Sequence, residues 1–203
     1  MRGVAALLAV LLLLPLPHPL QAQEQAPIVV TATSVHYSFG QQATFSIAVS
    51  ADAGIHALYL YLQKEGDTRI DVAAVPFEGG TSVQASAQLD LRHHSLPPFG
   101  DVAWWWEVRD AIGNTLTTEP SVFQYVDNRF EWRTVSAGPV RLYTVVDDAL
   151  YTQAALDIAQ TSLVQIAQAL GSAPPDEVKL YIYPSLADLR AALEMGGREW
   201  MGG

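Results

Sequence analysis

Histidines are candidates for chemistry in this chain, because paired imidazoles at a set spacing form metal sites and acid–base sites. After residue 22 the chain has His36, His56, His93 and His94. None of them stands one helical turn from another, and no His-Glu-x-x-His sequence is present. His93 and His94 are adjacent, and successive strand side chains point to opposite faces. We therefore expect them in a loop or at a strand end and not on a shared metal.

Other catalytic motifs are also missing from the sequence. There is no cysteine, which excludes disulfides, a Cys-ligated zinc, a thiol nucleophile and a lipid-modified cysteine. There is no Gly-x-Ser-x-Gly elbow and no phosphate-binding glycine loop. Asp147-Asp148 is predicted to cap a helix, and Asp176-Glu177 to lie in a solvated turn. The sequence thus predicts no catalytic residue, no cofactor-binding residue and no metal ligand in this chain.

Three consecutive tryptophans, Trp104-Trp105-Trp106, form the densest aromatic cluster in the chain. On a strand, Trp104 and Trp106 share one face while Trp105 points to the other. Two interpretations stay open. In the first, one face fills a core and the other covers a contact between domains. In the second, the rings form a platform on which a sugar or a peptide stacks.

The tryptophans lie in a region, residues 27–126, that is predicted to be an immunoglobulin-like or fibronectin-III-like β-sandwich. Short segments with alternating apolar residues recur there, with turn signals between them. Phe45, Ile47 and Val49, for example, alternate with polar or small residues. The expected strand segments are Ile28–Phe39, Ala43–Ser50, Ala57–Gln63, Arg69–Phe77, Ser82–Leu91, Val102–Arg109 and Thr115–Tyr125.

Residues 127–138 are predicted to be a connector docked on a domain, and the apolar pattern changes from period 2 to period 3.6 after it. The segment 139–203 then predicts an incomplete α/β lobe with the order strand–helix–strand–helix. Its strands are Val140–Val146 and Val178–Tyr183, its long helix is Ala149–Leu170 before Gly171, and its second helix ends near Met195. The predicted buried stripe of the long helix contains Leu150, Ala154, Ala155, Ile158, Ala159, Leu163, Ile166, Ala167 and Leu170.

The N-terminus has the pattern of a secretory signal peptide, residues 1–22. Arg2 precedes the apolar run Val4–Leu14, three prolines follow, and Ala22 is the expected last residue removed. An uncleaved anchor is the alternative, but the run is about half of the roughly 20 residues that span a bilayer. We expect a secreted or cell-envelope protein without stable membrane insertion. Its formal net charge of −10 argues against nucleic acid as a partner.

Several stretches resemble bacterial exported proteins of the peptidase-MA-like group, which are gluzincin-type zinc metallopeptidases. The matching stretches are Val108–Asn114, Phe123–Trp132, Tyr151–Leu156 and Val178–Ser185. The resemblance implies a sandwich, then the front of a peptidase-like domain, with the zinc helix later in a longer form. It carries over Asp127, Arg129, Phe130 and Trp132 as a structural joint only.

Taken together, the sequence predicts the N-terminal part of an exported zinc-metallopeptidase-like protein, catalytically silent as it stands. The chain ends at Gly202-Gly203 inside an α/β pattern that we expect to be unfinished. A short, degenerate relative is one alternative. The other is a binding or structural module of the cell envelope that uses its sandwich to hold a protein or peptide partner.

Overall fold

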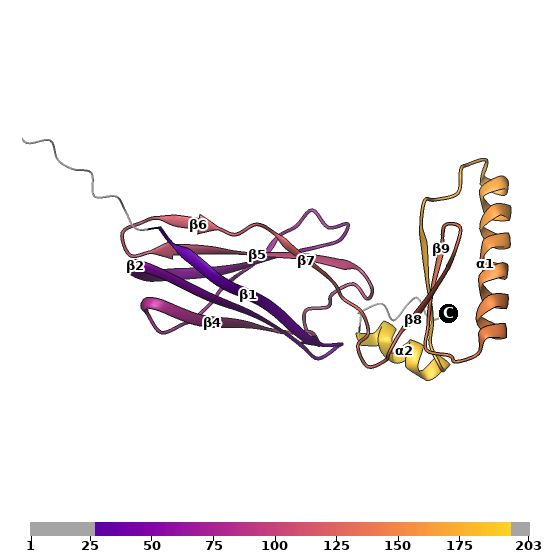
Figure 1. Cartoon of the computed structure of the whole chain (residues 1–203), viewed down its shortest axis with the longest axis horizontal. Helices are drawn as coiled ribbons and strands as arrows, with labels where there is room; N and C mark the ends of the chain where they lie inside the picture. The colour runs from indigo at the N-terminus through magenta and orange to yellow at the C-terminus, as the bar shows by residue number, and fades with distance from the viewer. Residues whose placement is uncertain (1–26, 196–203) are drawn as a thin grey trace, which may run out of the picture.

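The computed structural model describes residues 27–195, which form two parts lying end to end (Figure 1). The first part is a β-sandwich, and the second is a small α/β lobe, so the expected fold class is confirmed. The predicted signal peptide, 1–22, and the residues that follow the second helix, 196–203, lie outside the described residues. Within residues 27–195, neither helix is long and apolar enough to cross a membrane.

The sandwich is organised around one very long strand, β2 (Gln42–Lys64). Its first half pairs with β1 and β4, and its second half pairs with β3 and β5. The register shifts between Ser50 and Ile55, next to Gly54 at φ +81°. The remaining strands are β1 (Val29–Ser38), β3 (Asp71–Ala74), β4 (Gly80–Asp90), β5 (Asp101–Asp110), β6 (Thr115–Thr117) and β7 (Ser121–Gln124).

Three strand boundaries differ from the expectation. The segments 43–50 and 57–63 belong to the same strand, because β2 continues through a bulge near Gly54. The segment 115–125 is divided into β6 and β7, with Pro120 between them. Proline has no N–H to donate to a ladder, which accounts for that break. The segment 69–77 shortens to the four residues of β3.

The core of the sandwich lies where the two halves of β2 face each other. Phe45, Ile47 and Val49 point inward with at most 3% of their surface exposed, as the period of two predicts. Leu58 and Leu60 do the same on the other half at 2% each. One hydrogen-bonded sheet therefore folds over itself and encloses a single apolar cluster.

The lobe has three strands and not the two that were expected. The third is β8 (Arg133–Ala137), which lies within the range 127–138 predicted to be a connector. It turns through Gly138 at φ +54° and pairs antiparallel with β9 (Val140–Thr144). β9 pairs in parallel with β10 (Val178–Ile182), and α1 (Ala149–Leu170) joins the two. The sheet order is β10-β9-β8.

Both helices of the lobe begin as the sequence predicts. Asp148 accepts hydrogen bonds from the backbone N–H groups of Leu150 and Tyr151 at the start of α1, and Gly171 ends that helix at φ +63°. The Ser185 hydroxyl accepts a hydrogen bond of 3.1 Å from the backbone N–H of Asp188 and opens α2 (Leu186–Met195).

The predicted buried stripe of α1 is partly wrong. Leu156, Thr152 and Ala167 are buried, and Ala155, Ala159 and Leu163 pack beside them on Val140 and Leu142. The outer face instead carries apolar side chains with high exposure: Leu150 at 85%, Ile158 at 67%, Ile166 at 56% and Leu170 at 73%. Because apolar residues occur around more than one face of α1, their periodicity alone does not identify the packed face.

Candidate functional site

The outer face of the sandwich presents an aromatic platform, which we define as Tyr59, Tyr61 and Trp105. Tyr61 and Trp105 are directly opposite in the β2–β5 register. Their rings stack at 5.5 Å between centroids with an interplanar angle of 10°. The alternation in β2 explains the orientation, because Leu58, Leu60 and Leu62 occupy the inward positions. All three platform residues are half-buried.

Polar groups border the platform and hold it in place. The Tyr61 hydroxyl donates a 3.0 Å hydrogen bond to Glu107, and the Arg109 Nε donates one of 2.8 Å to the same carboxylate. The Arg109 guanidinium lies 5.1 Å from the centroid of the Tyr59 ring. The hydrogen bond to Glu107 raises the pKa of the Tyr61 hydroxyl above its usual value. The platform thus combines flat apolar ring faces with one carboxylate and one guanidinium at its side.

The three consecutive tryptophans divide between the core and this platform. Trp104 and Trp106 are 5% and 0% exposed and fill the sandwich core, as one interpretation held. That interpretation is wrong for Trp105. Its ring stacks on Tyr61 of the sandwich and does not cover the contact between the two domains. The placement of Trp105 leaves the platform interpretation open.

The four histidines are not brought together. His36 lies in β1 opposite Thr44, and His56 lies at the bulge of β2. The backbone N–H groups of His93 and His94 both donate to the Asp90 carbonyl in the turn after β4, at the strand end that was expected. Within residues 27–195, no three His, Asp or Glu side chains gather in a way that could hold a metal ion. The donor set described here does not fit zinc, and we derive no hydrolytic step from it.

The joint between the two parts centres on Asp127, whose side chain is fully buried. Its carboxylate accepts hydrogen bonds of 2.8 Å and 2.6 Å from the Arg129 guanidinium, and one of 3.1 Å from the Tyr183 hydroxyl of the lobe. The Trp132 indole N–H donates a 2.8 Å hydrogen bond to the Asp127 carbonyl. The same ion pair raises the pKa of Arg129. Asp127, Arg129 and Trp132, to which the resemblance gives the role of a joint, therefore lie in the contact between the sandwich and the lobe.

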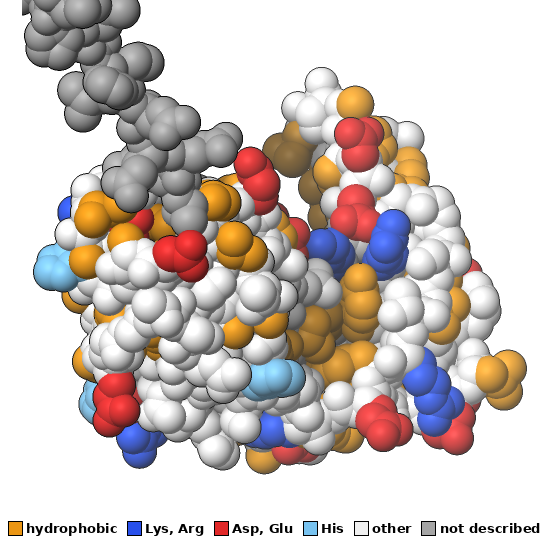
Figure 2. Space-filling model, turned by 60° about the vertical axis from the view of Figure 1, so that its left-hand side comes forward, with side chains coloured by type: hydrophobic (Ala, Val, Ile, Leu, Met, Phe, Trp, Pro, Cys, Tyr) orange, Lys and Arg blue, Asp and Glu red, His pale blue; other side chains and the backbone are white. Residues whose placement is uncertain are grey.

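An aromatic cluster extends this joint, and one member was missed in the sequence. Phe99 stacks on Tyr181 of the lobe at 3.5 Å between centroids and meets Trp132 edge-on at 5.6 Å. Phe130 packs against Tyr183 at 5.7 Å. Phe99 has φ +60°, which makes it the one non-glycine residue with positive φ among residues 27–195. The signal that could have pointed to it is the sequence Pro97-Pro98-Phe99-Gly100. Figure 2 shows a hollow between the two parts with hydrophobic side chains at its base.

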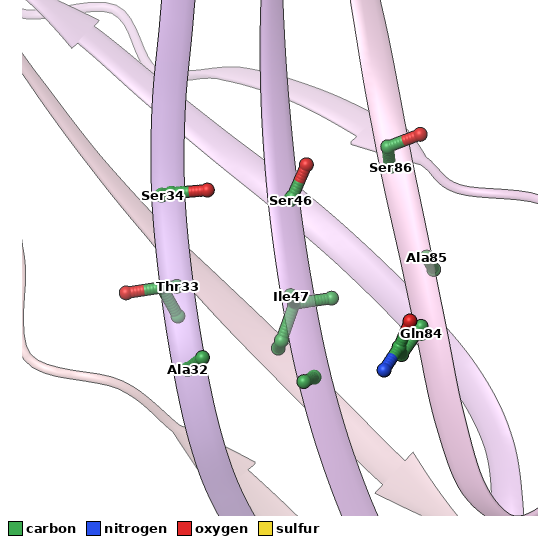
Figure 3. A pocket seen from close by; sticks show the side chains of 9 residues that line it. Ala32, Thr33, Ser34, Ser46, Ile47, Gln84, Ala85 and Ser86 are labelled. Carbon is green, nitrogen blue, oxygen red and sulfur yellow. The ribbon is translucent and has the colours of Figure 1, made fainter.

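A second concave surface lies on the half of the sandwich formed by β1, β4 and the first half of β2. It has a volume of about 340 Å³ and crosses the outer face of β1, β2 and β4. Ser34, Ser46 and Ser86 come from the three neighbouring strands, with Gln84 beside them (Figure 3). Its lining contains no charged residue and no aromatic ring, so it offers fewer recognition groups than the platform does.

The comparisons with known proteins give no family for the chain. No family model matches it, and no curated protein matches its sequence. Among solved structures, OgpA from Akkermansia muciniphila is similar at 16% identity and a TM-score of 0.42, over 51% of this chain and 28% of OgpA. OgpA has also been solved in an inactive form with an O-glycopeptide substrate.

Two smaller domains are similar over about half of the chain. A family 56 carbohydrate-binding module that binds β-1,3-glucan gives 5% identity and a TM-score of 0.32, over 49% of this chain and all of that domain. The third fibronectin III domain of human KIAA0343 gives 15% identity and a TM-score of 0.33, over 55% of this chain and 92% of that one. At these scores the similarities carry no conclusion about activity.

Proposed function

We propose that the chain is a non-catalytic module of an exported protein, and that its sandwich binds a carbohydrate on the aromatic platform. The single observation that carries this proposal is the orientation of Trp105. Trp104 and Trp106 are buried in the core, whereas Trp105 stacks with Tyr61 on the outer face.

The chemistry of the platform favours a sugar with one apolar face. A pyranose ring lays its C–H groups on an aromatic ring face, while its hydroxyl groups need donors and acceptors at the edge. Glu107 supplies the acceptor and Arg109 supplies the donor, and both are already oriented by their mutual ion pair at 2.6 Å. The ligand class is therefore a neutral oligosaccharide. A proline-rich peptide, which also stacks on aromatic rings, is the other outcome of the test.

Replacing Trp105 with alanine is expected to weaken oligosaccharide binding about tenfold or more, which corresponds to about 1.4 kcal/mol. The stacking surface is lost while the core tryptophans stay in place. Titration calorimetry with neutral oligosaccharides on the purified chain measures the effect. Tyr151→Ala is the control, because it removes an exposed aromatic side chain, 49% accessible, from α1 and leaves the sandwich unchanged. Equal affinity for the Trp105→Ala protein and the parent, or binding only by proline-rich peptides, would contradict the proposal.

A second function is favoured by the lobe, which we propose to be the front of a larger metallopeptidase-like domain. β10 pairs with β9 on one side, and no described strand pairs with its other side. The outer face of α1 exposes Leu150, Ile158 and Leu170 on the same lobe. The faces of parallel sheets are normally covered on both sides. These surfaces support the peptidase-like resemblance, in which the zinc ligands come from a longer form.

The chain of 203 residues is accordingly expected to bind no zinc with submicromolar affinity and to cleave no peptide. Zinc hydrolysis needs three protein ligands and an open fourth position, and the histidines described above lie apart. Titration calorimetry with Zn²⁺, together with a peptide-library cleavage assay, tests this expectation. Stoichiometric submicromolar binding with chelator-sensitive cleavage would show that an active site is present. Sequencing the reading frame after codon 203 tests the longer form directly.

A further inference from the structure

Strand β3 has an open edge. It pairs with β2 on one side, and no other strand among residues 27–195 pairs with it. The Val75 N–H donates a 2.9 Å hydrogen bond to the Leu58 carbonyl, which sets the phase of the pairing. In an antiparallel sheet, the N–H and C=O groups of one residue point to the same neighbouring strand. Those of the next residue point to the opposite side. Ala73 therefore faces β2, and Val72 and Ala74 turn their N–H and C=O groups to the open side.

A cavity of about 440 Å³ lies directly beside this edge. Its floor is formed by Leu62, Leu89 and Leu96, and two of these belong to the sandwich core, with 6% exposure for Leu62 and 1% for Leu96. The four consecutive residues 70–73 form one wall, so the cavity runs along the strand. Its volume falls within the range typical of ligand pockets, and its floor is entirely apolar.

The charges at the rim are already paired with each other. Lys64 and Asp71 both line the cavity, and the Lys64 Nζ lies 3.6 Å from an Asp71 carboxylate oxygen. Nearby, Arg69 pairs with Asp67 at 3.1 Å and Arg92 pairs with Asp90 at 2.6 Å. A charged ligand would have to break one of these ion pairs to form its own. The paired charges therefore do not favour the binding of an ionic ligand. Besides these ion pairs, His94 is the other polar side chain that lines the cavity. Recognition at this edge therefore rests on backbone hydrogen bonds and apolar contact, with the His94 imidazole as one further polar group.

The geometry points to an extended peptide of a partner protein that adds to β3 as a further strand. The backbone of this peptide pairs with Val72 and Ala74, and one large uncharged apolar side chain enters the cavity. The next residue of the peptide points outward beside Val72, which is 54% exposed. In this mode the main-chain hydrogen bonds supply affinity, and the cavity supplies sequence preference. A small apolar molecule is the other candidate occupant, and it would not need the β3 backbone.

The first part of the test selects linear heptapeptides displayed on phage, with the purified chain as bait. We expect enriched sequences with an apolar residue at one central position and no proline beside it. A synthetic peptide of the enriched sequence is then compared with a copy methylated at the backbone nitrogen next to the anchor residue. Methylation is expected to weaken binding at least tenfold, because it removes one ladder hydrogen bond without altering the protein.

Two protein variants complete the test. Ala73→Leu fills the cavity from its wall and is expected to weaken the peptide at least tenfold. Ala48→Leu, in the half of β2 that pairs with β1 and β4, is the control and is expected to leave binding unchanged. Trp105→Ala is also expected to leave it unchanged, which separates this site from the proposed carbohydrate platform. Lack of any enrichment, or peptides that tolerate both the methylation and Ala73→Leu, would overturn the inference. The backbone amide chemical shifts of the chain give a further check when the peptide is added. Changes at Tyr61 and Trp105 and not at Val72 and Ala74 would overturn the inference as well.

Discussion

The Asp127→Ala protein is expected to lose about 3 kcal/mol of its free energy of unfolding. The Asp127 carboxylate is fully buried and compensates the Arg129 guanidinium and the Tyr183 hydroxyl together. Removing one partner of a buried pair costs about 3–5 kcal/mol, because the other charge stays without compensation. We take the lower end since the Arg129 side chain is 31% exposed and regains some water. Urea unfolding, followed by far-ultraviolet circular dichroism, measures the loss.

The chain contains its own control for this substitution. Asp67 makes the same local turn, in which its carboxylate accepts hydrogen bonds from the backbone N–H and from the guanidinium of Arg69 two residues later. That pair is at the surface, with Arg69 82% exposed. Asp67→Ala is expected to leave the unfolding midpoint close to that of the parent, since surface ion pairs contribute little. Equal losses of unfolding free energy in both variants would mean that the contacts of Asp127 at the joint contribute no stability beyond that of the local turn.

The Leu156→Asp protein is expected to lose at least about 4 kcal/mol, enough to unfold the lobe. Leu156 is 1% exposed and packs on Val140 and Leu142, where an aspartate would have no partner. Ile158→Asp places the same residue type two positions along α1, where the side chain is 67% exposed. Its effect is expected to stay within about 0.5 kcal/mol, as for most surface substitutions.

Hydrogen exchange distinguishes the two variants. In Leu156→Asp the amides of α1 and β9 should lose protection while those of β2 and β5 keep it, because the lobe has its own small core. In Ile158→Asp all four elements should stay protected. Loss of protection in Ile158→Asp would show that the outer face of α1 is covered in solution. Equal loss in both parts of Leu156→Asp would mean that the joint makes them one cooperative unit.

The period of two predicted most of the sandwich, because strand alternation is a local property of the chain. Phe45, Ile47 and Val49 face the core as their spacing requires. The same reasoning failed between Ser50 and Ile55, where a bulge continues β2. A bulge and a turn both use glycine at positive φ, so Gly54 could not distinguish them. β8 was missed for a similar reason: a short strand at the edge of a sheet has little apolar alternation.

What the sequence alone determined about this protein is its fold class and the order of its two parts: a sandwich followed by an α/β lobe. It also determined the helix caps at Asp148 and Ser185, because capping depends on a few neighbouring residues. Which face of α1 packs, that Trp105 meets Tyr61, and that Phe99 and Tyr183 meet at the joint were decided by the tertiary structure. These contacts join residues far apart in the chain, and a local pattern holds no information about which distant surface is available to cover it.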